Sequence, residues 1–285
     1  MSLLKQLRKN ALPVVHVRHQ AGQPTLEVRD LAVRYDQRVA LAGITFSLKP
    51  GERIAVVGPN GAGKSTLFKA IAGIQPHSAG EVKIYGHEPG GHICIAYLPQ
   101  RSQVDWNFPA SVADVVMMGR ISKLGPLRWP SAGDWEYVRR CLGVVGLAEL
   151  EKRQIGELSG GQQQRMFIAR ALAQEAELML MDEPFTGLDV TSQEDILTIL
   201  EQLRQREVTV LASTHDLNLA GERFDRVLLL NRRQLGFGPG SEVFTTERLL
   251  EAYGGHLRLV ANGQQMLALG DTCCDDEGGP HEHLA

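Results

Sequence analysis

Residues 54–72 read IAVVGPNGAGKSTLFKAIA, and no other stretch of the chain constrains its structure as strongly. The apolar residues at its start are typical of a buried strand, and those after Lys64 are typical of a helix. Between them, residues 58–65 match the pattern G-x-x-x-x-G-K-[ST], which binds phosphate when it follows a strand and opens a helix. The stretch therefore predicts a P-loop and a nucleotide ligand.

Each part of this loop has a chemical use. Glycines let backbone N–H groups close around phosphate oxygens, and the helix N-terminus adds a favourable field. Lys64 should reach the β- and γ-phosphates, and Ser65 should ligate Mg²⁺. The alternative is a glycine-rich turn with an incidental lysine, which would not require every position to match. The residues expected to contact ATP here are Gly58, Asn60, Gly61, Gly63, Lys64, Ser65 and Thr66.

A second motif is the apolar stretch LMLM at residues 178–181, which ends in Asp182 and Glu183. Two carboxylates at a strand end can simply cap the next helix. With a P-loop in the same chain we prefer a catalytic interpretation, in which Asp182 holds the magnesium shell and Glu183 is the general base that polarises the attacking water.

A third motif is LSGGQQQR at residues 158–165. Ser159 followed by Gln162 can form a capping box at a helix start. That interpretation does not explain Gly160 and Gly161, because each costs the first turn up to about 1 kcal/mol relative to alanine. Bare backbone at a helix N-terminus favours close approach of an anion. One ATP cannot easily use both phosphate-binding ends of one chain, so we expect two copies, with each motif facing the P-loop of the other.

Together, GPNGAGKST, LSGGQ and LMLMDEP resemble the ABC (ATP-binding cassette) ATPase family over residues 25–240. The resemblance implies an α/β P-loop NTPase core with a helical subdomain insertion and a β-rich edge subdomain. It also implies ATP and Mg²⁺ as cofactors, and a dimer in which the P-loop and the signature LSGGQ of opposite copies enclose two ATP molecules.

Further residues match family positions one by one. Tyr35 matches the aromatic residue that stacks on adenine, a contact worth about 1–3 kcal/mol in comparable stacks; otherwise it is an ordinary strand tyrosine. Gln100, in AYLPQ, matches the glutamine that senses Mg²⁺ and the γ-phosphate and joins the core to the helical insertion. Asp189, in GLD, matches the loop that communicates across the dimer. His215 matches the switch histidine at the γ-phosphate, although a histidine after a strand is often structural.

The chain divides into three predicted parts. Residues 1–24 form an N-terminal extension, residues 25–240 the nucleotide-binding domain with a helical subdomain at about 101–170, and residues 241–285 a less regular C-terminal extension. Strands that alternate with helices after Gly160 predict a mainly parallel, covered sheet. The last fifteen residues read as a disordered tail. Its cysteines, histidines and acids could sense a metal, but they lack a recognised ligand spacing.

Composition limits the partners and the cellular compartment that the chain is expected to have. The chain has 285 residues, 43% of them hydrophobic, and a net charge of −3. A pI near 6.3 argues against a nucleic-acid partner. Four cysteines without a disulfide pattern indicate a reducing compartment. No run approaches the roughly 20 apolar residues that span a bilayer, so a membrane role requires a partner.

Transport is the use that the resemblance favours. Repair ATPases insert a long coiled coil, whereas 57 residues without a heptad pattern lie between Gln100 and Leu158. Translation factors carry two cassettes in one chain, and this chain has one. A binding module that does not hydrolyse ATP would be expected to lack Glu183 or His215. A non-transport ABC ATPase remains the alternative class.

The residues after Gln100, which read RSQVDWNFPASVADVVMMGR, are similar to the cassettes of manganese and zinc uptake systems, with iron and chelate importers as near relatives. Their apolar members can equally form the small core of the helical insertion. The resemblance implies transmembrane permease subunits as partners, a solute-binding protein acting indirectly, and a place at the cytoplasmic face of the membrane. The sequence does not distinguish manganese from zinc or iron.

Overall fold

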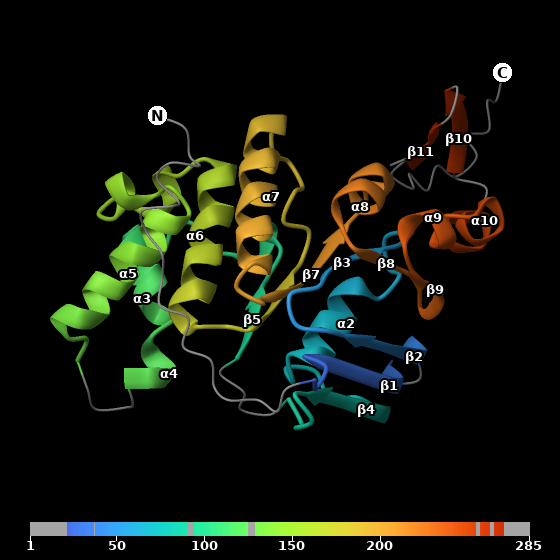
Figure 1. Cartoon of the computed structure of the whole chain (residues 1–285), viewed down its shortest axis with the longest axis horizontal. Coiled ribbons are helices and arrows are strands. Elements are labelled where there is room, and N and C mark those ends of the chain that lie inside the picture. Colours follow the sequence, from blue (N-terminus) through green and yellow to red (C-terminus); the bar gives the residue numbers. More distant parts are fainter. Residues whose placement is uncertain are drawn as a thin grey trace, which may run out of the picture.

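The computed structural model describes residues 22–36, 38–89, 94–124, 129–254, 257–262 and 265–270. Its centre is a nine-stranded sheet with the strand order β4-β1-β2-β9-β8-β3-β7-β6-β5 (Figure 1). The strands are β1 (Leu26–Tyr35), β2 (Arg38–Leu48), β3 (Arg53–Val57), β4 (Ala79–Ile84), β5 (Ile95–Leu98), β6 (Leu178–Met181), β7 (Thr209–Thr214), β8 (Arg226–Asn231) and β9 (Arg233–Gly238).

The sheet has a parallel core and an antiparallel edge. Strands β5, β6, β7, β3 and β8 run parallel to one another, whereas β1 pairs antiparallel with both β2 and β4. The α/β class, the covered parallel sheet and the β-rich edge predicted from the sequence are therefore confirmed. The α-helices in the described residues are α2 (Lys64–Ile71), α3 (Val112–Met118), α4 (Ile121–Leu124), α5 (Ala132–Val144), α6 (Gly160–Gln174), α7 (Val190–Arg204), α8 (Leu217–Arg223), α9 (Gly240–Val243) and α10 (Thr246–Tyr253).

Two apolar cores cover the two faces of the sheet. Ala55 and Val57 of β3 join one core, and the alternate residues Ile54 and Val56 join the other, because successive side chains of a strand point to opposite faces. Helices α5, α6 and α7 contribute buried residues to the first core, and α2 contributes to the second. The P-loop helix and the signature helix thus lie on opposite faces.

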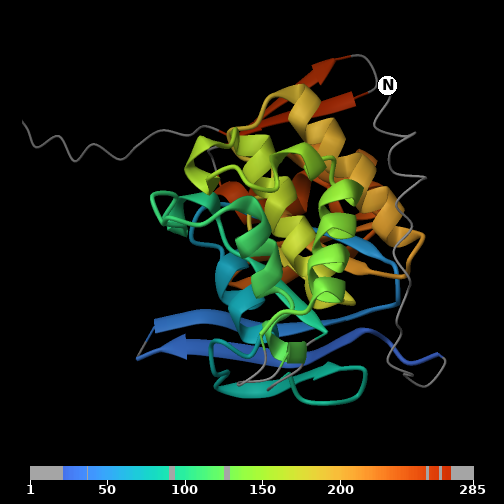
Figure 2. The same cartoon turned by 90° about the vertical axis from the view of Figure 1, so that its left-hand side faces the viewer.

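The segment between β5 and β6 is helical, as expected. Ser111, Ser131 and Ser159 each cap a helix, and each forms a capping box with the residue three positions later. A Cβ on Gly119 would lie 2.2 Å from the carbonyl oxygen of Arg170, so α3 ends in close contact with α6. Figure 2, in which this side of the molecule faces the viewer, shows these helices in front of the sheet.

The region after Gly240 differs from the prediction of less regular structure. It contains α9, α10 and a separate hairpin of β10 (Leu257–Asn262) and β11 (Gln265–Gly270). Thr245 caps α10, which buries Leu249 and Ala252. The helical spacing of these apolar residues was the missed signal. The cysteine- and histidine-containing tail, and all but the last three residues of the N-terminal extension, lie outside the described residues.

None of the helices in the described part of the chain is long and apolar enough to cross a membrane. Two of the four cysteines lie in this part: Cys94 and Cys141 are buried thiols that form no disulfide among the described residues. Burial raises the pKa of Cys94 to about 11 and that of Cys141 to about 12. Both thiols therefore behave as structural side chains rather than as nucleophiles.

Candidate functional site

The P-loop connects β3 to α2, as predicted. Gly61 has a φ of +75°, and a Cβ added there would meet no heavy atom within 4 Å, so backbone conformation alone favours glycine. Gly63, at a φ of +98°, caps α2. A Cβ on Gly63 would lie 2.9 Å from the backbone oxygen of Ala40, so this glycine also allows close packing against β2. The loop is thus fixed by conformation and by packing.

Lys64 is buried inside this loop, with a relative exposure of 6%. Its Nζ donates to the carbonyl oxygens of Gly58 at 2.8 Å and Pro59 at 3.1 Å. Burial lowers the pKa of Lys64, and the nearby carboxylates of Glu183 and Asp182 act in the opposite direction. The positive charge expected to meet phosphate is therefore held between loop carbonyls and two acidic groups.

The three predicted catalytic residues meet in one cluster. Gln100 Nε2 donates to Glu183 Oε2 at 2.8 Å, and His215 Nε2 lies 2.5 Å from Glu183 Oε1. The hydroxyl of Thr186 lies 3.4 Å from the same Oε2. An ionised carboxylate only accepts hydrogen bonds, so His215 must carry its proton on Nε2 in this arrangement. Both oxygens of Glu183 are thus oriented by neighbouring side chains.

The pKa of Glu183 lies below its ordinary value of 4.5. The hydrogen bond from His215 is the main cause; burial opposes it, and the charges of His215 and Lys64 lower the pKa further. Glu183 also has a φ of +52°, a left-handed conformation that costs a non-glycine residue energy and is found most often at functional sites. The carboxylate is held charged and in a fixed direction, as a group that polarises water must be.

Asp182 is buried beside this cluster, with a relative exposure of 2%. The Ser213 hydroxyl donates to Asp182 Oδ1 at 2.8 Å and accepts a hydrogen bond from the Glu183 backbone N–H, also at 2.8 Å. The Tyr97 hydroxyl lies 3.5 Å from Oδ2, and burial together with Asp182 raises its pKa to about 12. Ser213 was not among the predicted residues, because a serine in an apolar strand carries no motif.

The donor atoms of the predicted Mg²⁺ ligands suit a hard cation. Asp182 offers a carboxylate, and Ser65 and Gln100 offer a hydroxyl and an amide oxygen, which are the ligand types that Mg²⁺ prefers. Within the described residues no group of three or more His, Cys, Asp or Glu side chains forms a metal cage. A single carboxylate fits Mg²⁺ that completes its shell with nucleotide phosphates and water.

The signature residues lie elsewhere, at the start of α6. The backbone N–H of Ser159 donates to Gln162 Oε1 at 3.0 Å, and the backbone N–H of Gln162 donates to Ser159 Oγ at 3.4 Å. A Cβ on Gly160 would lie 2.8 Å from an Arg101 guanidinium nitrogen, and one on Gly161 would lie 2.7 Å from the Cβ of Ser192. The sequence alone gives no packing reason for these glycines. In the structure, a Cβ at Gly160 or Gly161 would require Arg101 or Ser192 of the same chain to shift.

The two remaining candidates, Asp189 and Tyr35, have no described contact with the Glu183 cluster. Asp189 is exposed and caps α7, accepting from the backbone N–H of Ser192 at 2.9 Å. Tyr35 ends β1 with 44% of its surface exposed, which leaves its ring accessible to a planar ligand. Both positions are compatible with the predicted roles.

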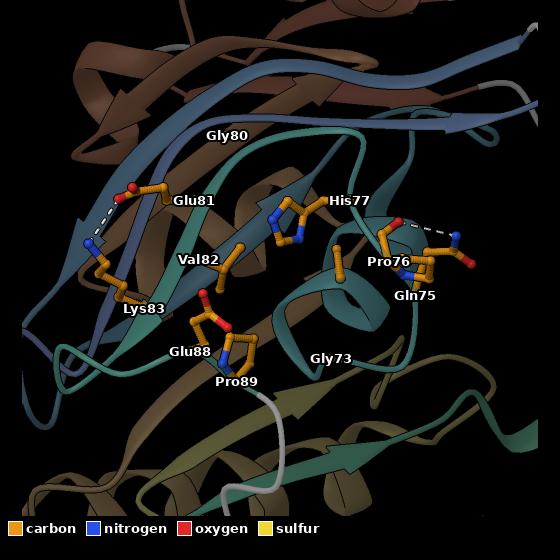
Figure 3. A pocket seen from close by; sticks show the side chains of 11 residues that line it. Gly73, Gln75, Pro76, His77, Gly80, Glu81, Val82, Lys83, Glu88 and Pro89 are labelled. Atoms are coloured by element: carbon orange, nitrogen blue, oxygen red, sulfur yellow. Dashed lines mark hydrogen bonds and ion pairs between the residues drawn. The ribbon is translucent and has the colours of Figure 1, made fainter.

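A cavity of about 430 Å³ opens at the far end of α2 from the P-loop (Figure 3). Its acidic and basic side chains include Glu81 and Lys83, two residues of β4 that form an ion pair at 2.9 Å. The predicted site residues are not among those that line this cavity. The predicted P-loop and catalytic residues instead follow strands β3, β5, β6 and β7.

Comparison with known proteins follows the same motifs. Residues 41–186 match the model of the family described as "ABC transporter". The chain is 45% identical to the Manganese transport system ATP-binding protein MntB of Bacillus subtilis (strain 168), over 82% of this chain and 94% of that protein. It is also 45% identical to the Zinc transport system ATP-binding protein TroB of Treponema pallidum (strain Nichols), over 81% of this chain and 88% of that protein.

Among solved structures, the fold resembles a metal-chelate type ABC transporter in an inward-facing conformation. The TM-score is 0.74 at 30% sequence identity, and the match covers 86% of this chain and 96% of that one. The similarity in sequence and in fold extends over most of the chain.

Proposed function

The chain belongs to the ABC transporter family of ATP-binding proteins, and from this premise we propose that it powers a metal-ion importer by hydrolysing ATP with Glu183 as the base. Nucleotide binding and hydrolysis coupled to transport follow from the family. The observation that supports the proposed mechanism is that Gln100 and His215 each form a hydrogen bond with one carboxylate oxygen of Glu183.

In this mechanism the P-loop residues Gly58, Asn60, Gly61, Gly63, Ser65 and Thr66 hold the phosphates, and Tyr35 holds adenine. Lys64 exchanges the carbonyls of Gly58 and Pro59 for phosphate oxygens, which are stronger partners for an ammonium because they are charged. Glu183 orients and polarises the attacking water, and His215 contacts the γ-phosphate. Asp182, Ser65 and Gln100 would hold Mg²⁺, which would supply Lewis-acid stabilisation of charge on the phosphates.

We further propose that two copies act together. Because α2 and α6 lie on opposite faces of the sheet, the phosphate-binding end of α2 and the signature at the start of α6 belong to separate parts of one copy. Ser159, Gly160, Gly161 and Gln162 would meet the nucleotide held by the P-loop of the second copy, and Asp189 would carry the contact between copies. ATP then closes the dimer and hydrolysis reopens it, which requires ATP to bind the closed state more tightly.

The cargo we propose is manganese or zinc, because relatives 45% identical over most of their length carry those names. A permease would receive the motion at the cytoplasmic face of the membrane, and a solute-binding protein would deliver the metal to it. An iron or chelate importer is the alternative, favoured by the likeness to a metal-chelate type transporter.

The test compares whole-cell manganese, zinc and iron in the wild type and in a Glu183→Gln strain grown under metal limitation. A matched control strain carries Glu194→Gln, which removes an exposed ion pair with Arg223 instead. We expect one metal to fall in the Glu183→Gln strain alone, and that metal is the cargo. Unchanged metals, with a wild-type protein that hydrolyses ATP, would contradict the metal cargo and leave the ATPase assignment in place.

A further inference from the structure

Arg101 directly follows Gln100 and opens the short helix η1 (Arg101–Gln103). Its Nε donates to Gln163 Oε1 at 2.6 Å, which joins this residue to α6. Its carbonyl oxygen accepts a hydrogen bond from the Trp106 indole at 3.0 Å. The residue after Gln100 is therefore anchored through both its side chain and its backbone.

The acceptor on α6 is unusually constrained. Gln163 has a relative exposure of 3%, and its Nε2 donates to the carbonyl oxygen of Ile155 at 3.4 Å. A buried amide oxygen without a donor costs free energy, and Arg101 supplies a charged one. The backbone N–H of Gln163 also donates to the carbonyl oxygen of Ser159, so Gln163 lies one helical turn from the signature serine.

The guanidinium of Arg101 also lies next to the signature residue Gly160. The space that a Cβ on Gly160 would occupy lies 2.8 Å from one of its nitrogens and 3.1 Å from Leu188 Cδ2. The same segment packs on α6 a second time, where the ring of Trp106 meets Phe167 edge-on with centroids 5.7 Å apart. Hydrogen bonding and packing thus fix Arg101 against the first turn of α6.

We propose that Arg101 is a positioning residue that holds the signature turn of α6 in register with Gln100. Gln100 contacts the catalytic carboxylate and Arg101 contacts the signature helix, so two consecutive residues join the hydrolytic site of one copy to the surface that serves the nucleotide of the other. This inference rests on the proposed function. Arg101 touches neither Glu183 nor the P-loop among its described contacts, and it acts on catalysis through α6.

The experiment measures ATP hydrolysis by the purified full-length chain in four forms: wild type, Arg101→Met, Gln163→Met and the double variant. Methionine keeps much of the length of each side chain and removes its hydrogen-bonding groups. We expect kcat to fall about tenfold or more in each single variant, because a charge-assisted bond to a buried group is lost. The double variant should be no worse than the more impaired single variant, because the two residues act as a unit. Arg101→Lys, whose ammonium can still donate, should recover part of the loss.

Two further measurements separate positioning from other roles. In Arg101→Met, the affinity of the single copy for a fluorescent ATP analogue should be unchanged, because the P-loop is intact. When Arg101→Met is combined with Glu183→Gln, the ATP concentration needed to form the dimer should be higher than for Glu183→Gln alone. Arg139→Met is the matched control, since Arg139 is an exposed arginine of α5 that pairs with Glu151. It should leave kcat and dimer formation unchanged.

Three outcomes would overturn the inference. The first is a wild-type kcat in Arg101→Met, and the second is additive losses of kcat in the double variant. The third is a loss of kcat that accompanies a lower melting temperature and occurs equally in Arg139→Met. Failure of the proposed function would look different: Glu183→Gln would then hydrolyse ATP at the wild-type rate, whatever the Arg101 variants do.

Discussion

Gln100 Nε2 lies 2.8 Å from Glu183 Oε2, although 83 positions separate the two residues in the chain. Each follows a strand of the parallel sheet: Leu98 of β5 pairs with Met181 of β6, so their carboxyl ends meet at one edge. His215 follows β7, the next strand in the sheet. Three adjacent strands thus deliver the cluster to the edge where open α/β sheets bind their ligands.

Glu183→Gln should slow hydrolysis by orders of magnitude while ATP still binds. The amide keeps the shape of the carboxylate, but it cannot polarise water or accept a proton, and general-base catalysis is worth about 10²–10⁴-fold. We expect phosphate release to fall by that order, ATP affinity to stay within a few-fold, and the ATP-bound dimer to accumulate on gel filtration. Hydrolysis at the full rate would remove Glu183 from its role as the base.

Lys64→Ala should weaken ATP binding by about tenfold or more, because a charged hydrogen bond contributes about 1.5–3 kcal/mol. Equilibrium titration with an ATP analogue measures the change. Lys69→Ala is the matched control, because Lys69 lies on the same helix and its side chain makes no described contact with the P-loop. Normal affinity in Lys64→Ala, or an equal loss in both variants, would contradict the phosphate assignment.

Ser213→Ala should lower both stability and kcat. The change leaves the Glu183 N–H without its acceptor and Asp182 without its donor, which costs about 1–3 kcal/mol of unfolding free energy. Thr209→Val removes another buried hydroxyl, which bonds to Thr25 and Lys49 away from the cluster. Urea denaturation should show comparable losses in the two variants, whereas a steady-state assay should show a lower kcat in Ser213→Ala alone.

Local pattern was enough to predict the core elements. The strand LMLM and the helix from Gly160 to Gln174 occur as expected, because apolar runs and capping residues act over a few positions. The resemblance supplied Gln100 and His215, and the structure brings both to Glu183. Their meeting depends on strand order, which no local pattern contains.

Ser213 and the neighbours of Gly161 could not be predicted for the same reason. Ser213 is one polar residue in a buried strand, and its partners lie 30 and 31 positions away. Gly161 faces Ser192 of α7, a contact that exists only once two helices have packed. Such contacts follow from tertiary structure, so local sequence points only to phosphate approach as the reason for this glycine.

The pKa of Glu183 predicts a pH dependence of stability. Because the folded state lowers this pKa below 4.5, the ionised carboxylate contributes fully well above that pH, and its contribution is lost as the pH falls from the unfolded value through the folded one. We expect the difference in unfolding free energy between wild type and Glu183→Gln to be constant above about pH 5.5 and to shrink as the pH falls through 4.5. A difference that stays constant or grows as the pH falls through 4.5 would show that the carboxylate is not stabilised in the folded chain.

Gly161→Ala tests whether the signature glycine serves packing, phosphate approach or both. An added Cβ would lie 2.5 Å from the hydroxyl oxygen and 2.7 Å from the Cβ of Ser192, so overpacking should cost about 1–3 kcal/mol and exceed the gain of about 1 kcal/mol in helix propensity. Adding Ser192→Gly removes both obstructing atoms and should restore most of the unfolding free energy, with Ser192→Gly alone as the control. If the nucleotide of a second copy must approach this backbone, kcat of the double variant should stay low while its stability recovers. Recovery of both would assign the glycine to packing within one chain.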